Sequence, residues 1–252
     1  MHKYFAKPLF LAKSIEYLPE CHSTNEEMVN RAKSGNLAEG HLIHTDHQIK
    51  GKGQRGNMWE SSPGQNLLFS MYLKPKSLQP KDIYLINIIA GLAVLSAIES
   101  DVDIRAELKW PNDLYLNDFK AGGVLIESCL NAGMIESMVV GIGINVNQTE
   151  FGNPNATSLF KVTNQAIDRL ELLEDIVVQF EKYYLKLRSN RRSEIMQEYY
   201  SNMRWRGEEH IFEDSEGSFK GEILGVDDSG KLVVKTNDRS RRFDVKEITF
   251  MK

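Results

Sequence analysis

The sequence predicts an α+β protein in two parts, a mixed or antiparallel sheet with helices followed by a small β module. Two helical patterns come before four strand patterns in a row, and short turns join these strands, which favours hairpins over parallel crossovers. From about Gly207 the pattern changes to short alternating strands. We therefore expect one domain over residues 1–205 and a barrel-like module over 206–252. The module is too short to be stable alone, so it should dock on the first domain.

Each element of the first half has a local signal. Ser23 and Glu26 have the spacing of a capping box, which predicts a helix to about Lys33 that ends at Gly35. A strand over 41–45 leads into a glycine-rich loop, and the apolar run 66–73 predicts a buried strand. Residues 83–98 are apolar nearly all round, as expected of a helix buried against a sheet.

The second half begins with the hairpin patterns. We expect strands at 107–110, 113–116, 123–127 and 137–146, with turns at 117–118 and 131–133. Helices should follow at roughly 164–189 and 191–203. The predicted strands of the C-terminal module are 209–213, 218–226, 231–235 and 242–244.

Composition excludes several classes of protein. The chain has 252 residues, a formal net charge of −4 and 41% hydrophobic residues, which suits a packed core and argues against a dedicated nucleic-acid binder. We expect no apolar run to reach the length of a membrane span. The charged, proline-containing N-terminus does not resemble a signal peptide. Cys21 and Cys129 are too few for a disulfide framework or a cysteine metal site. We therefore expect a cytoplasmic protein with neither DNA nor a membrane as partner.

The most informative segment is the loop 48–63, which combines glycines with cations and one large aromatic. Its glycines allow the backbone to approach a ligand closely, while Lys50, Lys52 and Arg55 attract an anion. The loop also fits the spacing of a dinucleotide-binding fingerprint, but no helix opens after it, so that interpretation is rejected. A mobile basic surface loop is the alternative on this segment alone.

Three further segments interleave polar and charged residues with apolar ones where strands should turn. They are residues 109–114 (KWPNDL), 120–127 (KAGGVLIE) and 141–147 (GIGINVN). Buried charges need partners or ligands, so these side chains are expected beside a buried cleft. Taken singly, each segment has a local explanation, such as Asn112 and Asp113 as turn formers or Lys120 at the end of a hairpin.

Taken together, the motifs closely resemble those of the biotin protein ligases over roughly residues 16–250. The resemblance rests on STN at 23–25, Gln48 with GKGQRG at 51–56, Trp59, and the three segments above. It implies a mixed-sheet catalytic domain of the class II synthetase-like, biotin/lipoate ligase type and an SH3-like C-terminal barrel. It also implies biotin and ATP as substrates with Mg²⁺, and a biotin carboxyl carrier protein whose lysine accepts biotin. The family includes monomers and homodimers.

The resemblance also implies roles for particular residues. Lys120 matches the lysine that stands between the biotin carboxylate and the α-phosphate, two anions that repel each other. The biotin-binding residues would be Ser23, Thr24, Asn25, Gln48, Lys52, Gly53, Gln54, Lys120 and Gly123. The nucleotide-binding residues would be Gly51, Arg55, Trp59, Lys109, Asn112 and Asn145. Asp113 is the candidate Mg²⁺ ligand, and we also consider it as the carboxylate that helps the acceptor lysine to lose its proton.

This chain departs from the family pattern at one position of the loop. The family loop usually reads GRGRxG, whereas here it reads GKGQRG, so Gln54 stands where a cation is usual. Gln54 can donate hydrogen bonds but cannot neutralise a phosphate. We therefore expect the biotinyl-adenylate to be retained more weakly than in relatives with arginine there. The stretch before Ser23 is too short for the DNA-binding domain of some biotin ligases, so the form without that domain is expected.

Three alternative functions fit parts of the sequence. Lipoate ligases share the architecture and the adenylation chemistry, but their usual RRxSGGG loop is absent from this sequence. A non-catalytic biotin or nucleotide sensor would keep the pocket without the reactive cation, whereas Lys120 is present. A scaffold that uses the C-terminal barrel has no other support in the sequence.

Overall fold

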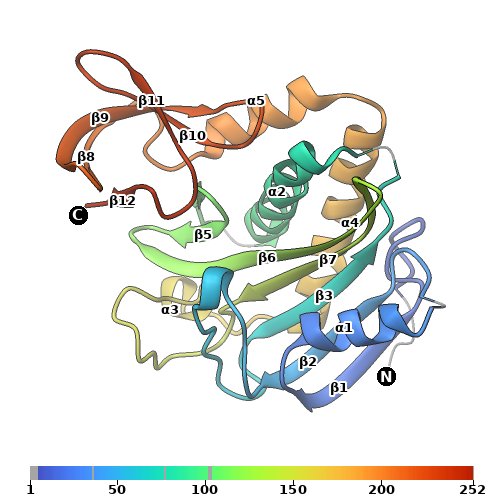
Figure 1. Ribbon diagram of the computed structural model, residues 1–252. Coiled ribbons are helices and arrows are strands. Elements are labelled where there is room, and N and C mark those ends of the chain that lie inside the picture. The colour runs from blue at the N-terminus through green and yellow to red at the C-terminus, as the bar shows by residue number, and fades with distance from the viewer. Residues whose placement is uncertain (1–4, 36, 77, 102–103, 252) are drawn as a thin grey trace.

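The fold consists of two β-sheets with helices on both faces of the larger one (Figure 1). The computed structural model describes residues 5–35, 37–76, 78–101 and 104–251. The large sheet has seven strands in the order β1-β2-β3-β7-β6-β5-β4, and the second has five in the order β11-β10-β9-β8-β12. β1 runs parallel to β2 and the other neighbours in the large sheet are antiparallel, so the sheet is mixed, as expected.

The elements of the large sheet and its helices follow one another closely. The strands are β1 (Ile15–Cys21), β2 (Leu42–Gln48), β3 (Leu67–Leu73), β4 (Ala106–Lys109), β5 (Asp113–Leu116), β6 (Phe119–Asn131) and β7 (Met134–Ile144). The helices are α1 (Thr24–Lys33), η1 (Gln54–Gly56), η2 (Pro80–Asp82), α2 (Ile83–Asp101), α3 (Leu159–Thr163), α4 (Arg169–Arg188) and α5 (Arg192–Asn202).

The alternation of side chains along the strands divides the core between the two faces of the large sheet. Leu42 packs in the main core with α2 and α4, whereas its neighbour Ile43 packs with Met28 of α1. Val140 and Val139 of β7 are divided in the same way. α2 and α4 therefore cover one face, and α1 covers part of the other (Figure 1). The rest of the α1 face remains for the loop 48–63.

The second sheet forms the C-terminal module and docks beside β4 and β5. Its strands are β8 (Glu209–Asp214), β9 (Gly217–Val226), β10 (Leu232–Lys235), β11 (Ser240–Phe243) and β12 (Thr249–Phe250). The Trp110 indole N–H donates to the Gly230 carbonyl at 3.0 Å, and the Tyr200 hydroxyl donates to the Val226 carbonyl at 3.0 Å. These two contacts fix the module against the first domain.

Several local expectations differ from the structure. The capping box is wrong: Ser23 occupies the N-cap without a side-chain hydrogen bond, and the Gln48 side-chain amide oxygen (Oε1) accepts from the Thr24 backbone N–H instead. β1, α3 and β12 were not predicted, and residues 164–168 are not helical. β6 and β7 form a longer hairpin than expected, because their pairing continues to Asn131 and Met134.

The expectation about membrane-length segments also needs correction. One helix among the described residues, spanning Pro80–Ser100, is long and apolar enough to cross a membrane by length and composition. However, 61% of its most apolar window is buried inside the protein, and a core helix passes the same test. Packing against the sheet and α4 therefore accounts for its apolar character.

Candidate functional site

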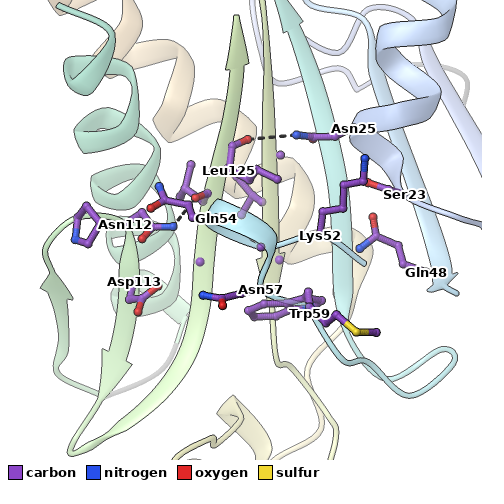
Figure 2. A pocket seen from close by; sticks show the side chains of 18 of the residues that line it. Ser23, Asn25, Gln48, Lys52, Gln54, Asn57, Trp59, Asn112, Asp113 and Leu125 are labelled. Carbon is purple, nitrogen blue, oxygen red and sulfur yellow. Dashed lines mark hydrogen bonds between the residues drawn. The ribbon is translucent and has the colours of Figure 1, made fainter. Parts of the chain in front are cut away.

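A cavity of about 230 Å³ lies on the α1 face of the large sheet and gathers most of the predicted site residues. Figure 2 shows Asn112 and Asp113 on the opposite side of this cavity from Ser23 and Gln48. The predicted residues that line it are Ser23, Thr24, Asn25, Gln48, Lys52, Gly53, Gln54, Trp59, Asn112, Asp113, Lys120 and Gly123. Motifs that are distant in the sequence thus meet at one place.

One end of the cavity carries a network of buried hydrogen bonds. The Gln48 side-chain amide oxygen (Oε1) accepts from the Thr24 backbone N–H at 2.8 Å and from the Thr24 hydroxyl at 3.1 Å. The Asn25 amide nitrogen donates to Glu127 at 2.8 Å, and its oxygen accepts from Ser70 at 2.6 Å. Because these partners fix the orientation of each amide and hydroxyl, this end suits a neutral ligand that both donates and accepts.

Two glycines of β7 make this arrangement possible. A side chain at position 141 or 143 would project from the face of the sheet that α1 covers. A β-carbon on Gly141 would lie 2.1 Å from the Asn25 amide oxygen. A β-carbon on Gly143 would lie 2.9 Å from the Trp59 ring. The alternating glycines of the segment 141–147 therefore make room for two predicted ligand-binding side chains. We call Asn25, Ser70, Gly123, Gly141 and Gly143 the cavity floor.

Lys120 reaches the cavity because of an irregularity in β6. Leu114 pairs with Gly122 but Tyr115 pairs with Lys120, so Ala121 is an extra residue and the strand is bulged. Bulges re-aim side chains, and the Lys120 ammonium lies near Gly123 and forms an ion pair of 2.6 Å with Asp113. Its ammonium lies 5.9 Å from the centroid of the Trp59 ring. The predicted catalytic pair is thus in direct contact.

The loop 48–63 folds over the cavity as a short closed turn. Lys52 and Met58 form an antiparallel β-bridge, and the Trp59 backbone N–H donates to the Gly51 carbonyl at 2.9 Å. The short helix η1 lies at the tip of this turn. The Lys52 ammonium forms an ion pair of 2.5 Å with Glu26 of α1. This contact raises the pKa of Lys52 and lowers that of Glu26. We call residues 48–63, together with the turn 244–247, the cavity cover.

Two residues predicted to bind the nucleotide carry buried polar atoms without a partner. Among the described residues, neither the Trp59 indole nitrogen nor the Asn145 amide oxygen has a hydrogen bond. Asn145 is 4% exposed, and its amide nitrogen donates to the Thr157 carbonyl at 2.9 Å. Because buried polar atoms usually have a hydrogen-bond partner, both atoms are candidates for contact with a bound ligand. Asn112 instead uses its amide nitrogen within the fold, donating to the Val124 carbonyl at 2.6 Å.

Three predicted residues, Lys109, Gly51 and Asn145, do not line the cavity, and a fourth, Arg55, cannot be placed. The Lys109 ammonium lies over the rings of Tyr115 and Phe250, at 5.3 and 4.6 Å from the centroids, toward the C-terminal module. Gly51 and Asn145 are buried behind the lining residues. The side chain of Arg55 lies outside what the structure describes. The roles assigned to these four residues stay predictions.

Other lining residues were missed in the sequence. They are Asn57, Met58, Pro111, Val124, Leu125, Gly141, Ile142, Gly143, Val245 and Lys246. Ser70, which lies behind the cavity, was also missed, although a serine within the apolar run 66–73 is a usable signal. Val245 and Lys246 carry no such signal, because only the docking of the C-terminal module brings them to the cavity.

Metal binding has limited support from the protein side chains. No group of three or more histidine, cysteine, aspartate or glutamate residues capable of holding a metal ion occurs among the described residues. Among the described residues that line the cavity, Asp113 is the single acid. Mg²⁺ commonly uses one or two carboxylates together with substrate phosphates, so this site fits an ion that arrives with a nucleotide.

Comparisons with known proteins agree with the motifs. Residues 17–145 match the Biotin/lipoate A/B protein ligase family. The Bifunctional ligase/repressor BirA of Bacillus subtilis is 31% identical over 221 residues, which cover 86% of this chain and 68% of that protein. The Biotin--[acetyl-CoA-carboxylase] ligase of Mycobacterium tuberculosis is 25% identical over 90% of this chain and 85% of its own length.

A solved structure with both sequence and fold similarity is the biotin protein ligase of Aquifex aeolicus in complex with biotin and ATP. It superposes with a TM-score of 0.80 at 31% identity and covers 95% of this chain and 99% of its own chain. The biotin protein ligase of Leishmania major, in complex with biotinyl-5-AMP, matches with a TM-score of 0.61 at 21% identity, which concerns the fold alone.

Proposed function

The chain belongs to the Biotin/lipoate A/B protein ligase family, and from that premise we propose that its cavity joins biotin to ATP and transfers the biotinyl group to a protein lysine. The protein is an ATP-dependent biotin ligase. The observation that carries this function is the meeting of the Lys120–Asp113 pair with the hydrogen-bonding network of Asn25 in one cavity. A charged centre beside a neutral donor and acceptor surface suits biotin, which has a carboxylate at one end and a ureido ring at the other.

In the first step, a biotin carboxylate oxygen attacks the α-phosphorus of ATP, and the bond to the β-phosphate oxygen breaks. Both reactants are anions, so they repel each other as they approach. We assign Lys120 to hold a carboxylate oxygen and an α-phosphate oxygen together, because its compact charge can reach either one. Mg²⁺, when bound with ATP, would neutralise charge on the phosphates, and Asp113 is the nearest candidate ligand.

In the second step, the acceptor lysine attacks the acyl carbon of biotinyl-adenylate, and AMP leaves with the acyl-phosphate oxygen. Only about one lysine in a thousand is neutral near pH 7.4, so the amine must lose a proton as it reacts. We propose Asp113 as the carboxylate that promotes this loss. Asp113→Asn should then slow transfer from preformed adenylate; if only adenylate formation slows, the assignment to proton removal is wrong.

The acceptor we propose is the carrier protein of a biotin-dependent carboxylase, on the basis of the name of the Mycobacterium relative. We also propose that the enzyme works in the cytoplasm, where its free thiols Cys21 and Cys129 would remain reduced. Monomeric and homodimeric forms are both compatible with this chemistry.

A labelling experiment tests the complete reaction. The protein is incubated with ATP, Mg²⁺, biotin and a purified biotin carboxyl carrier domain, and the mass of the carrier is measured. The expected result is an increase by one biotinyl group, which disappears when the acceptor lysine of the carrier is changed to arginine. An unmodified carrier, in a reaction that a known biotin ligase completes, would contradict the proposed function.

A further inference from the structure

Glu127 of β6 stands behind the cavity floor and is not used by the chemistry proposed above. It does not line the cavity, and it is partly buried. Its carboxylate accepts from the Asn25 amide nitrogen at 2.8 Å, and the Leu125 carbonyl accepts from the same nitrogen at 3.3 Å. A carboxylate accepts hydrogen bonds and cannot donate them. The Asn25 amide must therefore turn its nitrogen toward β6 and its oxygen away from it.

The Ser70 hydroxyl passes this orientation on to Thr24. The Ser70 oxygen lies 2.6 Å from the Asn25 amide oxygen and 2.7 Å from the Thr24 hydroxyl oxygen. All three residues are buried, so solvent has little access to these bonds. A hydroxyl has a single hydrogen, and the Asn25 amide oxygen can only accept one. Ser70 therefore donates to Asn25 and can meet Thr24 only as an acceptor.

Thr24 and Gln48 present the resulting order of donors and acceptors to the cavity, which both residues line. The Thr24 hydroxyl can donate to Ser70 at 2.7 Å or to Gln48 at 3.1 Å, and the shorter contact is favoured. In either case its oxygen can still accept an N–H from a ligand. The Gln48 amide oxygen already accepts from the Thr24 backbone N–H at 2.8 Å, so its amide nitrogen faces elsewhere and can donate. One acceptor and one donor at fixed places match the N–H groups and the carbonyl of a ureido ring.

We propose that Glu127 is a positioning residue, which sets the direction of the hydrogen-bond chain through Asn25, Ser70 and Thr24 and thereby the affinity of the floor for a ureido ring. This inference deepens the proposed function and rests on it, since it requires biotin at the floor. Glu127 acts through other side chains and needs no contact with biotin. The opposite direction would bring the Asn25 amide oxygen against the carboxylate, where neither oxygen could donate.

The test is biotin-dependent exchange of pyrophosphate into ATP, with kcat and the KM values for biotin and for ATP measured separately. Glu127→Gln keeps the shape of the side chain but can accept or donate, so the Asn25 amide is no longer held in one orientation. Its KM for biotin should rise on the order of tenfold, while kcat and the KM for ATP stay within about twofold of the wild type. Glu136→Gln, the same change at an exposed glutamate of the β6–β7 hairpin, serves as the matched control.

A double-mutant cycle with Thr24→Val distinguishes positioning from a general structural role. Valine keeps the shape of threonine without the hydroxyl, so the chain no longer reaches the ligand through this residue. If Glu127 acts through Thr24, the double variant should have the same KM for biotin as Thr24→Val, within about twofold. Two independent rises that multiply would overturn the inference, and so would an unchanged KM in Glu127→Gln with the wild type active. Absence of exchange in the wild type would instead contradict the proposed function.

Discussion

The cavity floor holds Asn25 and Ser70 at 3% and 0% exposure, whereas the cavity cover holds Lys52 and Met58 at 46% and 75%. The floor is held by hydrogen bonds between side chains such as Asn25 and Ser70, whereas the ion pair described above for the cover joins the partly exposed side chains of Lys52 and Glu26. Buried networks are costly to disturb, while exposed ion pairs contribute little stability and exchange partners readily. From this contrast we propose that the floor determines which ligand binds and that the cover supplies charge during turnover.

Lys120 stands where the floor meets the cover, and its removal should have the largest effect. Lys120→Ala leaves the two anions without a cation between them, so biotin-dependent pyrophosphate exchange should fall on the order of a thousandfold. The fold should remain, because the Lys120–Asp113 pair is partly exposed. Lys235→Ala, at an exposed lysine of the C-terminal module, serves as the control. Retention of more than about a tenth of the wild-type rate, too small a loss for this role, would show that the key residue is misassigned.

A change in the floor should impair biotin binding next most strongly. In Gly141→Ala the new β-carbon would lie 2.1 Å from the Asn25 amide oxygen, so that side chain must leave its partners. We expect a loss of about 2–3 kcal/mol in unfolding free energy and a rise in the KM for biotin on the order of a hundredfold. Denaturant unfolding and exchange kinetics measure these effects.

The control for the floor is Gly152→Ala, where a β-carbon would meet the flexible end of the Glu60 side chain at 3.1 Å. This variant should behave like the wild type in both measurements. If the KM of Gly141→Ala for biotin lies within about twofold of the wild-type value, a difference of about 0.4 kcal/mol, the floor does not determine biotin recognition. The proposed difference between floor and cover would then be wrong.

A change in the cover should alter adenylate retention and leave the floor intact. Gln54→Arg restores a cation beside the phosphate, and charged hydrogen bonds are stronger than neutral ones. Release of biotinyl-adenylate should therefore slow by about tenfold, or about 1.4 kcal/mol, without a change in the KM for biotin. Equal release rates from the two proteins would show that position 54 does not contact the intermediate.

The smallest effect should come from the ion pair between Lys52 and Glu26. Contact with Lys52 lowers the pKa of Glu26 from its ordinary value of 4.5. The pair therefore stabilises the fold fully at pH values above 4.5, and this contribution is lost as the pH falls through the lowered pKa. Because both side chains are more than a third exposed, Glu26→Gln should cost less than about 0.5 kcal/mol at pH 7. Unfolding free energies of the two proteins should converge once the pH has fallen below the lowered pKa of Glu26. A difference that persists there would contradict the pairing.

The sequence predicted parts of both regions: it named Asn25 and Gly123 of the floor and Lys52, Gly53, Gln54 and Trp59 of the cover, but it missed Ser70, Gly141 and Gly143 of the floor. Asn25, Lys120 and the glycines of 141–147 lie in segments where polar or glycine residues interrupt apolar runs, and such interruptions mark a ligand site. The mixed sheet also followed from the hairpin patterns. β1 was missed because Glu16, Pro19 and Glu20 weaken its strand signal at the edge of the sheet.

The remaining differences depend on tertiary contacts. The spacing of Ser23 and Glu26 predicts a capping box, but Gln48 satisfies the helix N-terminus and Lys52 attracts Glu26. Lys109 belongs to a predicted ligand motif, yet its ammonium lies over rings toward the C-terminal module. Lys246 reaches the cavity through the docking of that module. None of these partners is near in sequence, so local patterns could not identify them.

The most direct test of the account is pyrophosphate exchange into ATP by the wild-type protein with Mg²⁺ and either biotin, lipoate or no acid. We predict exchange with biotin and none with lipoate or without an acid, because the floor offers fixed donors and acceptors to a ureido ring that lipoate lacks. Exchange with lipoate alone, or no exchange under any condition, would contradict the claim that this cavity activates biotin.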